Sequence, residues 1–130
     1  MAHRVVLVDE SEGEEGACRQ MAELLERAPQ VDGVCAMVDT FARGVVRAVR
    51  ESGRTVPDDV RIATRYDGIR ARTSEPPLTA IDLHLNETAA AAVELLLQVM
   101  SGEDTPAPAD VALPNLVPRA SSAVLTPLGR

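Results

Sequence analysis

Two aspartates, Asp39 and Asp67, are the strongest candidates for chemistry, because each follows closely on a segment with the pattern of a buried strand. To act as a catalytic pair, one of the two carboxyl groups would need a raised pKa. To accept hydrogen bonds from a hydroxylated ligand, neither carboxylate needs a special environment. We therefore predict that these two residues bind a ligand and do not catalyse a reaction.

The other reactive side chains give weaker signals. His3 and His84 are far apart in the sequence, and Cys18 and Cys35 lack the C-x-x-C spacing of redox and zinc sites. We expect each cysteine to lie on an apolar face, where a free thiol behaves as a small hydrophobic group. The chain has no nucleophile elbow, phosphate-binding loop or dinucleotide fingerprint. We predict no catalytic residue, no metal site and no cofactor.

Arginines gather after the third predicted strand, at Arg65, Arg70 and Arg72. Two interpretations are open for this cluster. It is either part of a solvated loop, or it contacts an anion or a carboxylate, for which the guanidinium group is well suited.

The composition excludes several classes of function. The chain has 130 residues and a formal net charge of -7, and all 13 of its basic residues are arginine. A net acidic chain is a poor ligand for DNA phosphates. The aromatic content of 2% leaves almost no stacking platform for bases or sugar rings. Acidic residues interrupt the N-terminus before a signal peptide could form, and no apolar run is long enough for a membrane span.

The first half of the chain alternates between strand and helix patterns. Continuous apolar runs predict buried strands over residues 5–8, 34–38 and 60–64. An amphipathic helix is predicted over 12–27, with Ser11 and Glu14 in capping-box spacing, and a second helix is capped by Thr40 and ended by Gly53. This order predicts an α/β fold in which helices flank a parallel sheet.

Ligands of parallel α/β sheets bind beyond the carboxyl ends of the strands. Those ends are predicted at residues 9–11, 38–40 and 64–69. These three segments are the binding site that the pattern alone predicts.

After Ile81 a helix is predicted over residues 87–100, with Asn86 or Thr88 as its cap. The rest is predicted as a proline-rich connection over 103–109, short strands over 111–113 and 116–117 with Pro118 at a sheet edge, and a loose tail from Ser121.

Four segments in order resemble the C-terminal part of LacI/GalR-family transcriptional regulators. Residues 48–60, AVRESGRTVPDDV, and residues 75–81, EPPLTAI, resemble two adjacent family segments. Residues 92–102 resemble the helix that follows them, and residues 113–121, LPNLVPRAS, resemble the closing segment. The resemblance covers residues 5–122.

The family fold is a two-lobed, periplasmic-binding-protein-like α/β domain that follows a helix-turn-helix. The resemblance implies that residues 1–122 are a partial effector-binding and dimerisation domain, one lobe of the type I fold, and that 123–130 are a tail. It implies that the chain begins after the helix-turn-helix and most of the first lobe. Residues 86–102 would normally cross to that lobe, so we expect the helix to fold back or to pack against a second chain.

The resemblance places the ligand-binding residues Asp39, Thr40, Tyr66 and Asp67 in the effector cleft. Two positions depart from the family pattern. Val38 stands where the family usually has an effector-contacting Asn, and Tyr66 stands where it usually has an Asp. The departures imply either an unusual effector or a lobe that no longer binds one.

Family dimers pair their second lobes through the helix after the second strand and the Pro-Pro-Leu-Thr segment. A two-fold axis places each such surface against its own copy. The resemblance therefore implies a homodimer interface formed by Phe41, Val45, Val46, Val49, Pro77, Leu78 and Ile81.

We interpret the chain as the effector-binding and dimerisation portion of a cytoplasmic LacI-type regulator, and not as an enzyme. A sugar- or nucleoside-like effector would bias lobe closure and reposition a helix-turn-helix outside this chain. The chain itself would contact neither nucleic acid nor membrane. The alternatives are a fragment of a solute-binding protein of the same fold and a small α/β enzyme that uses Asp39 and Asp67.

Overall fold

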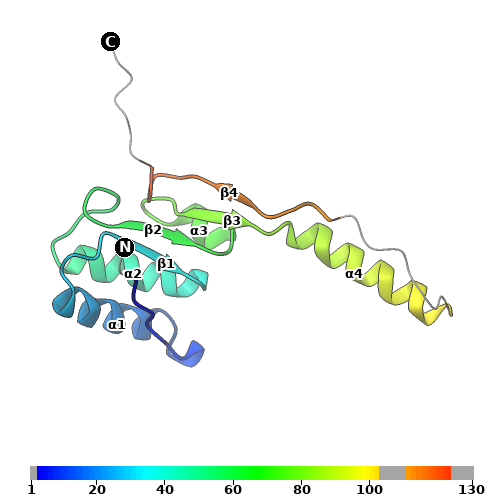
Figure 1. Ribbon diagram of the computed structural model, residues 1–130, viewed down its shortest axis with the longest axis horizontal. Helices are drawn as coiled ribbons and strands as arrows, with labels where there is room; N and C mark the ends of the chain where they lie inside the picture. Colours follow the sequence, from blue (N-terminus) through cyan, green and yellow to red (C-terminus); the bar gives the residue numbers. More distant parts are fainter. Residues whose placement is uncertain (1–2, 103–110, 124–130) are drawn as a thin grey trace, which may run out of the picture.

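A four-stranded sheet forms the centre of the protein (Figure 1). The computed structural model describes residues 3–102 and 111–123. The strands are neighbours in chain order: β1 (Gly33–Ala36), β2 (Arg61–Thr64), β3 (Thr79–Asp82) and β4 (Asn115–Val117). The first three run parallel, and β4 is antiparallel to β3. The predicted α/β fold is confirmed, with the difference that the fourth strand makes the sheet mixed.

Two long helices lie on one side of the sheet (Figure 1). Helix α2 (Asp39–Glu51) packs on β1 and β2, and α1 (Gly13–Arg27) packs on α2. A 3-10 turn, η1 (Glu10–Glu12), leads into α1. The short helix α3 (Ile69–Thr73) lies in the segment that the sequence predicted only as a polar loop. Helix α4 (Leu85–Met100) extends away from the sheet.

The core lies between the sheet and α2. Along β2 the side chains alternate, so that Ile62 and Thr64 are buried while Arg61 is exposed. Helix α2 presents an apolar stripe to them, and Val49 in that stripe is fully buried. Burial of one such side chain contributes about 1.5–3 kcal/mol relative to exposure.

Helices α1 and α2 approach each other closely at Gly44. A Cβ atom at this position would lie 2.3 Å from the carbonyl oxygen of Glu14 and 2.9 Å from the backbone nitrogen of Cys18. Glycine therefore permits the spacing of the two helices, because any larger residue would collide with the backbone of α1.

The segment after β4 ties the sheet together through Ser121. Its hydroxyl group donates to the carbonyl oxygen of Ile62 at 2.5 Å and accepts from the backbone N–H of Thr79 at 2.8 Å. Ser121 is fully buried, and its own carbonyl oxygen accepts from the N–H of Ile62. We call these contacts the Ser121 bridge. The bridge matters because β2 and β3 pair over only two residues, at Ala63 and Thr64.

Two predicted strands are wrong. Residues 5–8 and 111–113 have no strand beside them in the described part of the chain, and Leu7 is 87% exposed. Apolar residues form a strand only where a partner strand satisfies their backbone groups. The predicted strand at 116–117 is confirmed as β4, an edge strand followed by Pro118.

The strand predicted over 34–38 is shorter than expected and is not buried on both faces. It forms β1, at the open edge of the sheet, where Ala36 alone is buried. Cys35 is exposed, because alternate residues of β1 point away from the helices. The prediction that both cysteines lie on apolar faces is therefore confirmed for buried Cys18 and wrong for Cys35.

The predicted helix ends are right at Gly53 and wrong at three caps. Gly53 has a φ of 78° and follows the last turn of α2. Thr40 is the second residue of α2, not its cap. Asp9, not Ser11, caps the turn before α1, by accepting from the N–H of Ser11 at 2.8 Å. Helix α4 begins at Leu85 and its N-cap is His84, which lies two residues before Asn86 and four before Thr88, the two expected caps.

The expectation that α4 folds back on its own lobe is wrong for this structure. The helix has no buried residue, and among the described residues it forms no substantial contact with another element. Its exposed apolar side chains include Val93, Leu96 and Leu97. The connection 103–109 and residues 124–130 of the predicted tail lie outside the described residues. The prediction of a loose tail is wrong at its first residue, Ser121, which is fully buried and bonded to β2 and β3.

Candidate functional site

The carboxyl ends of β1 and β2 form one edge of the sheet. Ala36 pairs with Thr64, so the residues that follow these two positions leave the sheet at the same level. Asp39 and Thr40 begin α2 just after β1, and Tyr66 and Asp67 follow β2. The four residues predicted to bind a ligand therefore come from two neighbouring strand exits. We call this region the carboxyl edge.

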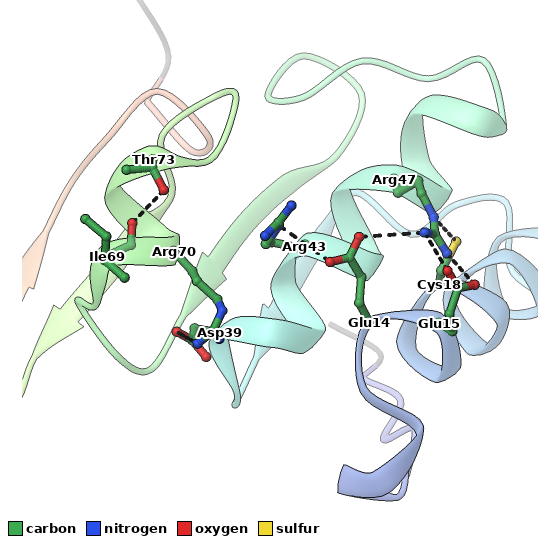
Figure 2. Close-up of polar contacts among 9 residues, drawn as sticks. All are labelled: Glu14, Glu15, Cys18, Asp39, Arg43, Arg47, Ile69, Arg70 and Thr73. Atoms are coloured by element: carbon green, nitrogen blue, oxygen red, sulfur yellow. Dashed lines mark hydrogen bonds and ion pairs between the residues drawn. The ribbon is translucent and has the colours of Figure 1, made fainter.

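Asp39 is partly covered and is paired with an arginine. Its carboxylate lies 3.4 Å from the Nη1 atom of Arg70 in α3, and its side chain is 13% exposed (Figure 2). As the first residue of α2, Asp39 also lies where the helix dipole favours a negative charge. It can accept a hydrogen bond from a ligand hydroxyl while Arg70 donates one.

Asp67 is held by two arginines. Arg119 Nη1 lies 2.6 Å from its Oδ1 atom, and Arg72 Nη2 lies 3.1 Å from Oδ2. The side chain of Asp67 is 7% exposed. The neighbouring Arg119 guanidinium, assisted by Arg72, lowers the pKa of Asp67 although burial acts in the opposite direction. A lowered pKa is the reverse of what a general acid needs, so the geometry favours a structural or binding role.

Tyr66 is the exposed aromatic side chain of the carboxyl edge. Its ring lies over Gly68, where a Cβ atom would come within 2.4 Å of the ring carbon Cε1. The absence of a side chain on Gly68 thus gives the ring its position. Tyr66 is 40% exposed, so its ring and hydroxyl group are accessible to a ligand.

The structure adds two polar residues to the region, Asp82, which the sequence analysis did not name, and His84, which it named but did not place in the site. Both lie where β3 ends. Asp82 Oδ1 accepts from the backbone N–H of His84 at 2.9 Å, and His84 has a left-handed φ of 49°. The signal that could have found them is Asp82 itself, an acidic residue at the exit of an apolar strand.

Two of the three arginines in the cluster after β2 contact carboxylates, as the second interpretation has it, whereas Arg65 is exposed. Arg70 pairs with Asp39, and Arg72 pairs with Asp67. Both carboxylates belong to the same chain, so these two arginines fix the carboxyl edge.

Most of the predicted dimer residues do not lie on the surface. Val45, Val46, Val49 and Leu78 are buried in the core of their own chain, because α2 turns its apolar stripe toward the sheet. This is a correction to the predicted interface. Pro77 is exposed, and two further residues, Phe41 and Ile81, are partly buried.

Neither a metal site nor a membrane span is found in the described part of the chain. Residues 3–102 and 111–123 contain no group of three or more His, Cys, Asp or Glu side chains arranged to hold a metal ion. Over the same ranges no helix is both long and apolar enough to cross a membrane.

Comparison with known proteins links this fold to transcriptional regulators. A family model described as periplasmic binding protein-like domain matches residues 1–122. The transcriptional regulator CelR of Thermobifida fusca is 38% identical over 85 residues, which are 65% of this chain and 25% of that protein. The chain thus spans about a quarter of this relative.

Solved structures of transcriptional regulators also share this fold. A LacI-family regulator from Arthrobacter sp. FB24 in complex with lactose has a TM-score of 0.76 at 34% identity, over 86% of this chain and 43% of that one. A CelR–cellobiose complex also has a TM-score of 0.76, at 33% identity, over 85% and 34% of the two chains. These relatives are transcriptional regulators, not enzymes.

Proposed function

The chain belongs to the periplasmic-binding-protein-like effector domains of LacI-family regulators, and on this premise we propose that its carboxyl edge binds a small sugar effector. The observation that carries the proposal is the position of Asp39 and Tyr66 at adjacent strand exits in a fold shared with a lactose complex and a cellobiose complex. Ligands of such sheets bind at this end.

The chemistry of the edge suits a neutral hydroxylated molecule. Asp39 accepts hydrogen bonds, Arg70 donates them, and the Thr40 hydroxyl group can do both. Tyr66 offers one aromatic face to the apolar side of a sugar ring. Asp67 contributes by holding this loop in place through Arg119 and Arg72. A nucleoside-like effector has similar hydroxyl groups and remains the second candidate.

We further propose that two copies pair and that the effector-bound state alters DNA binding elsewhere in the regulator. The surface candidates for pairing are Pro77, Phe41 and Ile81, since the other predicted residues are buried. Residues 1–122 would form this effector-binding unit, with residues 123–130 as a tail, in a cytoplasmic protein.

Calorimetric titration with cellobiose, lactose and a set of nucleosides tests the effector proposal. We expect one sugar to bind, and Asp39→Asn and Tyr66→Ala to weaken that binding by roughly tenfold each, because each removes one direct contact. Asp58→Asn is the matched control, as Asp58 is exposed and lies in the turn before β2. If no compound binds, or if the control weakens binding equally, the proposal is wrong.

Light scattering over a concentration series tests pairing separately. We expect a molar mass that rises toward that of a dimer, and a lower mass for Pro77→Asp, which places a charge on the proposed surface. A mass of one chain at every concentration would contradict pairing without affecting the effector proposal.

A further inference from the structure

A concave region lies between α2 and α3, and neither Tyr66 nor Asp67 lines it. Its volume is about 370 Å³, within the range of small-molecule sites. Four arginines line it, Arg43, Arg47, Arg50 and Arg70, against the two carboxylates of Glu14 and Glu75. We call this region the arginine cleft. The lining therefore carries charges of both signs, and Glu15 and Asp39 beside it pair with Arg47 and Arg70.

The four arginines are not equally neutralised. Arg47 is fully engaged, with two hydrogen bonds of 2.9 and 2.8 Å to Glu15. Arg43 has a single long contact of 3.5 Å, to Glu14 (Figure 2). Both side chains come from the same face of α2.

The other two arginines also have spare capacity. Arg50 donates to the backbone carbonyl oxygen of Glu75 at 2.6 Å and has no carboxylate within ion-pair distance among the described residues. Arg70 reaches Asp39 only at 3.4 Å and is half exposed. Three guanidinium groups in one cleft therefore keep donors free for a ligand.

The donors that remain free in this cleft attract anions, because guanidinium groups match the geometry of phosphate oxygens. Glu14 partly opposes this attraction, since it approaches both Arg43 and Arg47. The free donors therefore favour an anion with more than one charge over chloride.

We propose that the arginine cleft binds a doubly charged phosphate group, either as free phosphate or as a phosphate monoester. This site adjoins the carboxyl edge, with which it shares Arg70, and its ligand differs in charge from a neutral sugar. Arg43 and Arg50 supply the main donors, and Arg70 contributes a third.

Calorimetric titration at constant ionic strength tests the proposal, with inorganic phosphate, glycerol 3-phosphate and glycerol as probes. The protein concentration is one at which phosphate does not change the molar mass, so that binding is separated from pairing. We expect both phosphates to bind and glycerol not to bind. Tighter binding of the ester would assign the site to a phosphate monoester, and equal binding would assign it to free phosphate.

Four variants test which side chains of the cleft bind phosphate. Arg43→Gln and Arg50→Gln should each weaken phosphate binding about tenfold, because each removes a charged donor. Glu14→Gln should tighten it about two- to fivefold by removing an opposing charge, a gain that a folding defect cannot mimic. Arg27→Gln is the control, since Arg27 lies on α1 outside the cleft and pairs with Glu23. Equal losses in all three arginine variants, or equal heat from sodium chloride, would overturn the proposal.

Discussion

The guanidinium group of Arg119 lies 2.6 Å from the carboxylate of Asp67, and this ion pair joins the segment after β4 to the loop after β2. Arg119 Nη1 also donates to the carbonyl oxygen of Leu78 at 2.9 Å, just before β3. One arginine thus connects the loop after β2, the residue before β3 and the segment after β4. The position of Tyr66, the residue before Asp67, depends on this connection.

Asp67→Asn should lower the free energy of unfolding by about 2 kcal/mol, because hydrogen bonds to charged groups contribute more than neutral ones and the site is largely covered. Urea unfolding of both proteins measures the difference. Asp58→Asn, at an exposed turn, serves as the control and should change the value by less than about 0.5 kcal/mol. If Asp67→Asn leaves the free energy of unfolding unchanged, the pairing of this carboxylate with the two arginines does not stabilise the fold.

The same ion pair predicts a pH dependence with a definite sign. Arg119 lowers the pKa of Asp67 in the folded protein below the value of about 3.9 in an unfolded chain. Its stabilising contribution is therefore complete above about pH 5 and is lost as the pH falls through the folded pKa.

Unfolding measured from pH 7 to pH 3 checks this dependence. The stability difference between the wild type and Asp67→Asn should be constant at neutral pH and shrink below about pH 4. A difference that grows on acidification would contradict the assignment.

Ser121→Ala should destabilise the protein by about 2 kcal/mol, because it leaves the N–H of Thr79 without its partner in a buried position. Thermal and urea unfolding both report this change. Ser101→Ala, in an exposed position after α4, is the matched control. If the two variants are equally stable, the Ser121 bridge does not hold β2 and β3 together.

Leu97→Ala in α4 should change the free energy of unfolding by less than about 0.5 kcal/mol, since Leu97 is exposed and α4 has no substantial contact with the sheet. Leu25→Ala in α1 should cost about 2–5 kcal/mol, because Leu25 is buried in the core. Parallel urea titrations compare the two. A large cost at Leu97 would show that α4 packs on the body of the protein in solution.

The sequence predicted those parts of the fold that depend on local pattern. The apolar periodicity of α1 and α2, the stop at Gly53 and the strand at 60–64 all reflect side-chain spacing or backbone freedom. The sequence prediction failed where an element needs another segment to pair with or to pack on. The apolar run at 5–8 has the composition of a strand, but no strand lies beside it in residues 3–102 and 111–123. The position of α4 away from the sheet is likewise not determined by its composition.

The position of the candidate site along the chain was predictable from the sequence, but the ion pairs within it were not. Strand exits can be counted from the sequence, so Asp39 and Asp67 were found. That Asp67 pairs with Arg119 depends on how β4 returns beside β3, which no local pattern determines. Four of the seven predicted dimer residues are buried, and three of these, Val45, Val46 and Val49, are buried because the apolar face of α2 packs on the sheet.

An NMR titration of the ¹⁵N-labelled protein with cellobiose and lactose tests the central claim most directly, because it reports where a ligand binds. We expect the largest amide shift changes at Asp39, Thr40, Tyr66 and Asp67, with the changes lost in Tyr66→Ala. Shift changes confined to α4 or the arginine cleft, or none at saturating concentrations of either sugar, would contradict the proposal that the carboxyl edge binds a sugar effector.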